Sequence, residues 1–309
     1  MAVLTEGRPD GGRPVGRGGS GGVGKPHRRP GSAEPTGPLA KLRQRRRDSV
    51  VVYVILGVGA ALWLFPLITL VRQSIQYGGF GNYATVLTNT YNGVSLVRAF
   101  GNSAVIALLT TVLTCVTGAL AAYAFSKLDF PYRETFYHLT LLLLAVPAVA
   151  IMVPVYWITG NLGLFNSPLG VAMPEVVLTL PFAVLMLRNY ADGIPDELVE
   201  AARLDGAGHG RIFRHVFLPL TRPALINLAA LCVVWSVQDF IFPSMLLSDS
   251  NSTTAAQAVQ TIKAAFGPTP IQTSQYFAAL TLLAVPAVAI VVFGLKFITQ
   301  GITAGGVKE

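Results

Sequence analysis

The sequence predicts an all-α membrane protein with about six transmembrane helices. Two observations support this prediction. Hydrophobic residues make up 52% of the 309 residues and charged residues only 12%, whereas soluble domains carry roughly 25% charged residues. The mean hydropathy is +0.55, and the apolar residues form long runs after a polar first segment. This is the profile of a chain that crosses a membrane several times.

The apolar runs set the expected spans. The hydrocarbon core of a bilayer requires about 20 apolar residues in a helix, and the fourth run is interrupted by Pro174, Glu175 and Pro181. With their connections, the spans form a membrane domain over residues 50–300. The expected spans are residues 50–71, 98–126, 135–158, 172–190, 223–247 and 276–299.

Residues 1–49 are predicted to form a disordered basic tail, because they are rich in Gly, Pro and Arg and lack apolar content. They hold 11 of the 23 Lys and Arg residues. A basic cluster before an apolar run is a topology signal and can contact anionic lipid. This distribution argues against a nucleic-acid partner despite the net charge of +8.

Basic residues in the connections predict that both termini are cytoplasmic. Lys127 and Arg133 lie in the second connection, and four arginines lie in the fourth, whereas residues 159–171 contain none. Since cytoplasmic loops are enriched in Lys and Arg, the even connections are inside. Two cytoplasmic termini require an even number of spans, and six fits.

The chain contains one misleading motif. Residues 19–25 (GSGGVGK) resemble the start of a phosphate-binding loop, but Pro26 stands where the motif needs Ser or Thr for Mg²⁺. If ATP is used, another subunit must bind it. We therefore expect no cofactor in this chain. Cys115, Cys232 and the four histidines show no spacing typical of a metal site or a disulfide framework.

The loop at residues 191–222 is predicted to form two short helices. Pro195, followed by two acidic residues, is typical of a helix start, and Gly206 of a helix end. A second helix over residues 210–217 places its apolar side chains on one face, and Pro219 is expected to end it. From these features alone, the loop is either an amphipathic connection or a docking element for a soluble partner.

Residues 200–207 (EAARLDGA), Ile212, Phe213 and residues 218–220 closely resemble the EAA loop of permease subunits of binding-protein-dependent ABC importers. Three further stretches, at residues 100–103, 118–126 and 162–167, resemble the carbohydrate branch of this family. The tail at residues 301–308 resembles that of the smaller permease of maltose-type transporters. The similarity covers about residues 50–309.

The resemblance implies a role for particular residues. The EAA loop would form a coupling helix between spans four and five that sits in a cleft of an ATPase subunit. In the tail at residues 301–309, Gly305 and Gly306 would reach between the two ATPase subunits. The expected coupling residues are Glu200, Ala201, Ala202, Arg203, Asp205 and Gly206.

The resemblance also implies partners and a location. The chain would pair with a second, homologous permease, two ATPase subunits and an extracytoplasmic binding protein, in the cytoplasmic membrane of a bacterium. It would carry no catalytic residue, because its partners would bind ATP and Mg²⁺. The implied substrate is a di- or oligosaccharide, with glycerol phosphate esters as the alternative.

Polar residues within the spans are the candidates for the substrate pathway. A charge at mid-span costs about 2.5–3.5 kcal/mol on insertion scales, so such residues usually face the interior of the bundle. Asp239 is accompanied by Trp235, Gln238 and Phe240, and aromatic rings with carboxylates and amides suit sugars. Where the family often has a Trp-Asn-acidic-Phe pattern, this chain has Val237 and Gln238, which leaves a sugar contact open.

Glu175 lies early in the fourth span, beside Pro174. Two interpretations of this position are open: the side chain lines the pathway, or it lies at the outer surface, which is slightly favoured. The rival class is a secondary transporter that works alone. That class needs coupling-ion carboxylates in the spans, and only Glu175 and Asp239 are available.

Overall fold

The computed structural model describes residues 38–305 of the chain. Its contacts divide the chain into two units, residues 1–61 and 62–309. The described part of the first unit is helical and belongs to α1 (Pro38–Gln76). The segment at residues 1–49, expected to be disordered, is therefore helical from Pro38 onward, while residues 1–37 lie outside the described part.

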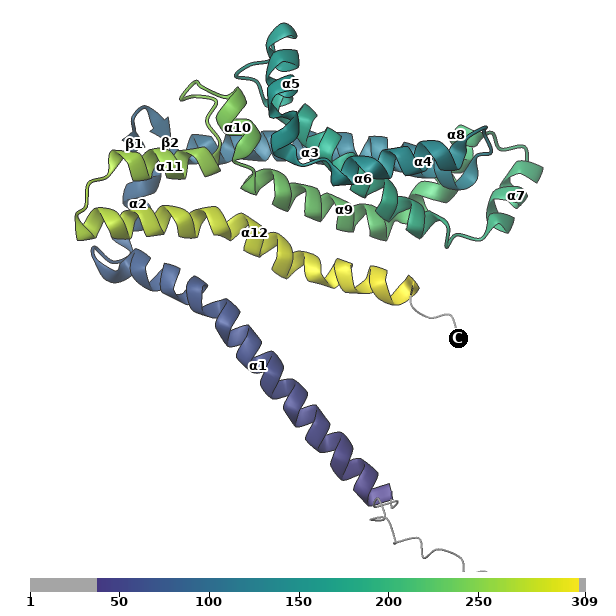
Figure 1. Ribbon diagram of the computed structural model, residues 1–309, viewed down its shortest axis with the longest axis horizontal. Coiled ribbons are helices and arrows are strands. Elements are labelled where there is room, and N and C mark those ends of the chain that lie inside the picture. Colours follow the sequence, from purple (N-terminus) through teal and green to yellow (C-terminus); the bar gives the residue numbers. More distant parts are fainter. Residues whose placement is uncertain (1–37, 306–309) are drawn as a thin grey trace, which may run out of the picture. The chain divides into compact units, whose positions relative to one another are not determined.

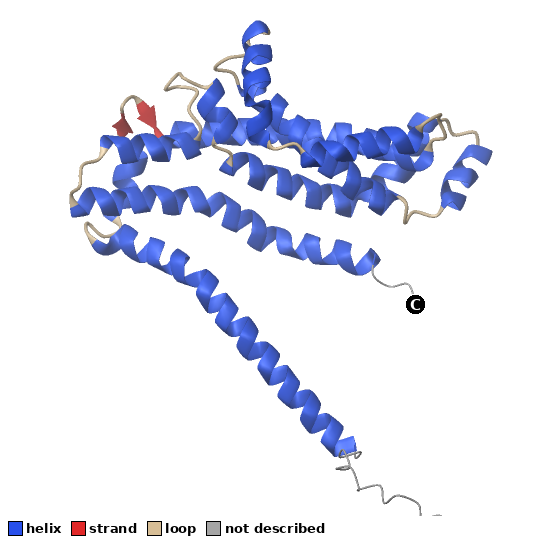
Figure 2. Ribbon diagram, in the orientation of Figure 1, coloured by secondary structure: helices blue, strands red, loops and turns tan. Residues whose placement is uncertain are grey.

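The second unit is built almost entirely of helices (Figures 1 and 2). Its order after α1 is α2 (Gly81–Thr88), β1 (Thr90–Tyr91), β2 (Val94–Ser95), α3 (Leu96–Lys127), α4 (Arg133–Leu142), a 3-10 turn (Leu143–Ala145), α5 (Ala148–Asn161), α6 (Pro168–Ala191), α7 (Asp196–Leu204), α8 (His209–Ile212), a π-helical turn (Phe213–Phe217), α9 (Leu218–Gln238), α10 (Ile241–Leu246), α11 (Ala255–Ala265) and α12 (Pro270–Gly305).

The expected number of spans agrees with the structure. Within the described residues, five helices are long and apolar enough to cross a membrane, and the number is six if a bent pair of helices is one span. The continuous candidates are Ser49–Gln76, Leu96–Lys127, Pro168–Ala191, His209–Gln238 and Pro270–Ile290. The chain is therefore an all-α, multi-pass membrane protein.

The third expected span, 135–158, is not one helix. Arg133–Ala145 and Ala148–Asn161 are bent by 101° relative to each other. Val146 and Pro147 between them have extended backbone. A proline drives the preceding residue out of the helical region and offers no N–H itself, which explains why the helix breaks here.

The fifth expected span, 223–247, is shifted toward the N-terminus. Pro219 does not end a helix, because the π-helical turn continues directly into α9, where Pro219 lies in the first turn and a proline is tolerated. At the other end α9 stops at Gln238, and Asp239 has extended backbone with ψ of 131°. Asp239 is thus at a break between α9 and α10 rather than inside a span.

The strands form a two-residue antiparallel hairpin in which Thr90 pairs with Ser95 and Tyr91 with Val94. Asn92 and Gly93 both have positive φ, as the tight hairpin turn requires. The sequence analysis did not anticipate this hairpin.

Helix α3 lies at the centre of the second unit, against α6 and α9, and α12 packs against α9 (Figure 1). Its apolar side chains Leu108 and Val116 are exposed, whereas Thr110 and Thr114 are buried. Polar side chains that face neighbouring helices, with apolar side chains on the outer face, are expected of a helix that is surrounded by lipid. Helices α3 and α6 lie close together at Gly118, where an added Cβ would lie 3.0 Å from the Cβ of Ala183.

Candidate functional site

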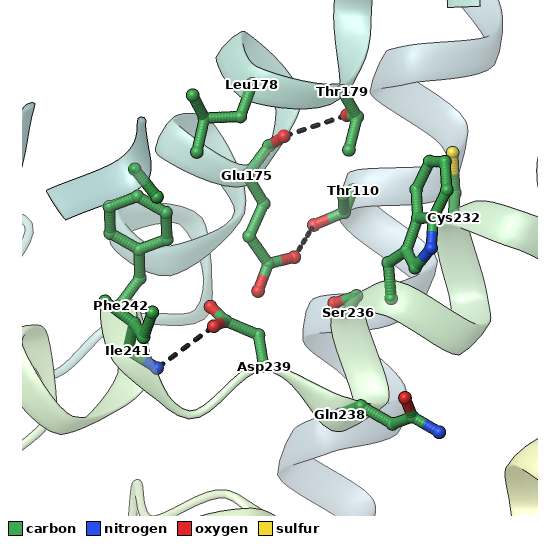
Figure 3. Close-up of a pocket in the computed structure, with 12 residues that line it drawn as sticks. Thr110, Glu175, Leu178, Thr179, Cys232, Ser236, Gln238, Asp239, Ile241 and Phe242 are labelled. Carbon is green, nitrogen blue, oxygen red and sulfur yellow. Dashed lines mark hydrogen bonds between the residues drawn. The ribbon is translucent and has the colours of Figure 1, made fainter. Parts of the chain in front are cut away.

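A cavity of about 240 Å³ lies between α3, α6, α9 and α10 (Figure 3). Apolar groups form most of its wall, and a few polar side chains from different helices converge on it, which is the usual composition of a small-molecule site. Its lining residues are Thr110, Ala148, Glu175, Leu178, Thr179, Cys232, Trp235, Ser236, Gln238, Asp239, Ile241 and Phe242.

Glu175 enters the cavity from the second turn of α6. The helix begins where the Ser167 hydroxyl accepts a hydrogen bond from the Gly170 N–H at 3.0 Å, and it carries Pro168 at its first position. The Glu175 residue is only 6% exposed. The interpretation that placed it at the outer surface is therefore wrong, because α3, α9 and α10 cover it.

One oxygen of the Glu175 carboxyl group is held and the other is not. The Thr110 hydroxyl of α3 donates to Oε2 at 2.7 Å. Oε1 is buried and has no hydrogen-bond partner within the described residues. The held oxygen fixes the direction of the carboxyl group, and the second oxygen points toward the carboxyl group of Asp239 (Figure 3).

Asp239 is arranged in the same way at the end of α9. Its Oδ1 accepts a hydrogen bond from the Ile241 N–H at 3.0 Å, so the side chain caps the start of α10. Its Oδ2 is buried and, in the described part of the chain, unpartnered. Figure 3 shows the carboxyl groups of Glu175 and Asp239 pointing toward each other.

A third polar atom completes this group. The Ser236 hydroxyl lies one helical turn before Asp239 and is buried. Among the described residues it also has no hydrogen-bond partner at normal distance and angle. A buried polar atom without a partner costs about 1–3 kcal/mol, and most buried polar groups in folded proteins are paired. Three such atoms, which lie beside one another at one cavity, make this cavity the candidate place for a ligand.

The aromatic wall is provided by Trp235. Its ring meets Phe182 of α6 edge-on, with ring centroids 5.3 Å apart, which fixes the indole in position. Gln238 lines the cavity beside it. Of the five residues expected in the pathway, Phe240 alone is not among the lining residues, and its side chain is 43% exposed.

The sequence analysis missed Thr110, Thr179 and Ser236. Thr179 donates to the Glu175 carbonyl oxygen at 2.8 Å and shares a 3.1 Å hydrogen bond with Thr114 of α3. Hydroxyl residues inside apolar runs were the available signal, but α3 alone has several. Only the packing of α3 against α6 identifies Thr110 as the partner of Glu175.

The second candidate site is the exposed face of α7. Val199 is buried in the core between α3, α6 and α9, and Ala202 packs against that core. The expected coupling residues Glu200, Ala201 and Asp205 are exposed. Arg203 and Gly206 are exposed as well, and Leu204 is 90% exposed. This face therefore exposes charged and apolar groups together, and the Arg203 guanidinium on it donates to the Lys127 carbonyl at 3.4 Å.

The end of α7 agrees with the sequence prediction. Gly206 has φ of +77°, the Gly206 N–H donates to the Arg203 carbonyl, and the Ala207 N–H donates to the Ala202 carbonyl at 2.9 Å. This paired pattern is a common glycine-dependent helix stop.

Lys127 attaches α7 to the end of α3. Its ammonium group donates to the Ile194 carbonyl at 2.8 Å and pairs with Asp196 at 2.7 Å. The Lys127 side chain is only 4% exposed, whereas Asp196 is 77% exposed. The bond to the buried carbonyl is therefore the stronger part of the attachment.

The structure describes only part of the expected tail site. Gly305 is the last residue of α12, so the backbone is helical there, and Gly306 lies outside the described residues. In the described part of the chain, no group of three or more His, Cys, Asp or Glu residues could hold a metal ion.

Residues 114–304 match the family described as the inner membrane component of binding-protein-dependent transport systems. This match includes α7 and all the cavity residues except Thr110.

Curated relatives cover most of the chain. The trehalose transport system permease protein SugB of Mycobacterium tuberculosis is 30% identical over 84% of this chain and 95% of its own length. The arabinooligosaccharides transport system permease protein AraQ of Bacillus subtilis is 30% identical over 80% of this chain and 91% of its own. The sn-glycerol-3-phosphate transport system permease protein UgpE of Yersinia pestis is 28% identical over 84% and 98%.

Solved structures share the fold. A chain of a bacterial ABC transporter that imports the acidic polysaccharide alginate superposes with a TM-score of 0.69 at 22% identity, over 82% of this chain and 97% of that one. A chain of the MetNI methionine ABC transporter gives a TM-score of 0.52 at 19% identity, over 67% and 95%.

Proposed function

Because this chain belongs to the family of inner membrane components of binding-protein-dependent transport systems, we propose that it forms half of the translocation pathway of an ATP-driven sugar importer. The family match over residues 114–304 carries this proposal. The relatives named for trehalose and arabinooligosaccharides support a di- or oligosaccharide as the substrate.

The proposed assembly contains several other subunits. A second permease completes the pathway, two ATPase subunits bind ATP and Mg²⁺, and an extracytoplasmic binding protein delivers the substrate. This chain is not catalytic and binds no cofactor. We place it in the cytoplasmic membrane of a bacterium, with both termini in the cytoplasm.

The proposed coupling element is α7. Its exposed face, with Glu200, Ala201 and Gly206, contacts an ATPase subunit, and Arg203 and Asp205 flank that contact. Closure of the ATPase subunits moves α7, and the bonds of Lys127 transmit the movement to α3. A rigid-body movement of packed helices is a common way to switch a transporter. At the other end of the chain, Gly305 and Gly306 belong to a tail that touches the ATPase subunits.

The proposed pathway includes the cavity. Glu175, Trp235, Gln238 and Asp239 contact the sugar there, and Phe240 lies at its edge. Glycerol phosphate esters are the second candidate substrate, favoured by the relative named for sn-glycerol 3-phosphate.

The coupling proposal is tested by changing α7 in the full transporter. Glu200→Ala removes an exposed carboxylate, and Gly206→Pro forces φ from +77° to about −65°. We expect each change to reduce transport-coupled ATP hydrolysis at least tenfold and to weaken retention of the ATPase subunits on purification. Gly208→Pro is the matched control, because Gly208 already has φ of −73°. Full transport by both test variants would show that α7 is not the docking element.

A further inference from the structure

We propose that Glu175, Asp239 and Ser236, with Thr110 as the anchor of Glu175, form a charge-selective subsite that takes the hydroxyl groups of a neutral sugar and rejects anionic substrates. This inference rests on the proposed function and narrows its substrate class. It favours neutral sugars over glycerol phosphate esters as the substrate, whereas membership of the family is compatible with both.

The first argument is the chemistry of the free atoms. A carboxylate only accepts hydrogen bonds, and a serine hydroxyl donates one and accepts others. The cavity therefore offers Glu175 Oε1 and Asp239 Oδ2, at least one of which accepts a hydrogen bond even when the two carboxyl groups hold one proton between them. Ser236 Oγ can either donate or accept. The complementary ligand is rich in O–H donors, as the adjacent hydroxyls of a sugar are.

The second argument is the charge of the subsite. Figure 3 shows the two carboxyl groups facing each other, with no arginine or lysine among the residues that line the cavity. A pair that shares a single proton still carries one negative charge. A phosphate or uronate group in this low-dielectric place would meet like charge without compensation.

The third argument is the way each carboxyl group is held. Thr110 anchors Glu175 through Oε2, and the Ile241 N–H anchors Asp239 through Oδ1. Each group is thus pre-organised with its second oxygen toward the cavity, which lowers the entropy lost on binding. A purely structural carboxyl group at this burial, 6% exposed for Glu175, would be expected to have both oxygens paired.

A metal ion explains the arrangement less well. Protein sites for hard divalent cations gather six or more oxygen ligands, and among the described residues no group of three or more His, Cys, Asp or Glu residues could hold a metal ion. Trp235 on the same wall is a flat apolar surface that suits the apolar face of a sugar ring. The volume of about 240 Å³ is below the roughly 300–1,000 Å³ of drug-sized pockets, so one sugar unit is held at a time.

The test uses the complete transporter, with its binding protein, in proteoliposomes. The probes are trehalose and an arabinotriose as neutral sugars, and sn-glycerol 3-phosphate as the anion. The variants Glu175→Gln and Asp239→Asn keep the shape of the side chain and remove its charge. Asp129→Asn is the matched control, because that carboxylate is fully exposed and outside the cavity.

We expect the unchanged transporter to take up a neutral sugar at least tenfold faster than sn-glycerol 3-phosphate. Each cavity variant should raise the KM for the sugar about tenfold or more, since hydrogen bonds to charged groups are the strong ones. Each variant should also lower the ratio of the neutral-sugar uptake rate to the sn-glycerol 3-phosphate uptake rate. Basal ATP hydrolysis and recovery of the complex serve as the folding check, and Thr110→Ser, which keeps the anchor hydroxyl, should retain the KM of the unchanged protein.

Failure of the subsite and failure of the proposed function would give different results in this experiment. Preferred uptake of sn-glycerol 3-phosphate, or an unchanged KM in both cavity variants, would overturn the subsite while leaving the importer intact. Sodium uptake that depends on both carboxylates would assign the cavity to a cation instead. Absence of ATP-dependent uptake of every probe would count against the proposed function and the subsite together.

Discussion

At the scale of single residues, Glu175 inside a candidate span and Asp239 at the break after α9 show how polar groups in a membrane protein acquire their partners. Each is a costly residue in an apolar segment, and each satisfies one oxygen locally or across a helix pair. The remaining oxygens converge on one cavity. The position of Asp239 after the end of α9 matters, because the extended backbone there directs the side chain toward the first residues of α10, where it accepts a hydrogen bond from the Ile241 N–H.

Gly118 is the residue on which the contact of α3 with α6 depends. An added Cβ would lie 3.0 Å from the Cβ of Ala183 and 3.5 Å from Leu187, so a larger side chain forces the helices apart. Overpacking of this kind costs about 1–3 kcal/mol. We expect Gly118→Val to lower the apparent thermal unfolding midpoint of the purified permease by several degrees.

Gly101→Val is the control for that measurement. It makes the same change in the same helix, but an added Cβ at Gly101 meets nothing within 4 Å. Equal loss of stability in the two variants would show that helix propensity, and not the α3–α6 contact, is responsible.

At the scale of elements, α7 is a short helix whose position depends on its neighbours. A helix of nine residues is not stable alone in water. Val199 buries one side of it, and the glycine stop at Gly206 ends it. Lys127 fixes its beginning.

We expect Lys127→Met to loosen the start of α7. The methionine keeps the apolar stem but loses the bonds to the Ile194 carbonyl and Asp196. A hydrogen bond from a charged group contributes about 1.5–3 kcal/mol, and the exposed Asp196 lowers the share of the ion pair. Amide hydrogen exchange over residues 194–204 should become about tenfold faster.

Arg133→Met provides the comparison. Arg133 pairs with Asp129 and Glu134 at the start of α4, and among the described residues it forms no hydrogen bond or ion pair with α7. Exchange in α7 that is unchanged by Lys127→Met, or equally raised by Arg133→Met, would contradict this role for Lys127.

At the scale of the whole molecule, the arrangement of spans predicts on which side each loop lies. Loop 162–167 should be extracytoplasmic and α7 cytoplasmic, following the distribution of basic residues. Leu162 is 65% exposed and Leu204 is 90% exposed, so cysteines at these positions report the side without disturbing the core.

In intact cells, we expect a membrane-impermeant maleimide to label Leu162→Cys directly and Leu204→Cys only after permeabilisation. The unsubstituted chain measures the background from Cys115 and Cys232, of which Cys232 is buried. Labelling of both positions from the same side would refute six spans with cytoplasmic termini.

The sequence by itself determined the all-α membrane character, a number of spans that agrees with the five or six candidates, and the helical start and stop of α7. These depend on local properties: the length of apolar runs, the backbone freedom of Gly206 and the distribution of basic residues. Local reasoning failed at Pro219, which was expected to end a helix but lies in the first turn of α9.

Only the tertiary structure decided that Glu175 faces inward and meets Asp239. Thr110 and Glu175 are separated by 65 positions in the chain, and no periodicity in either span connects them. The physical reason is that apolar runs specify helices, whereas helix packing, here through small residues such as Gly118 and Ala183, specifies which polar faces meet.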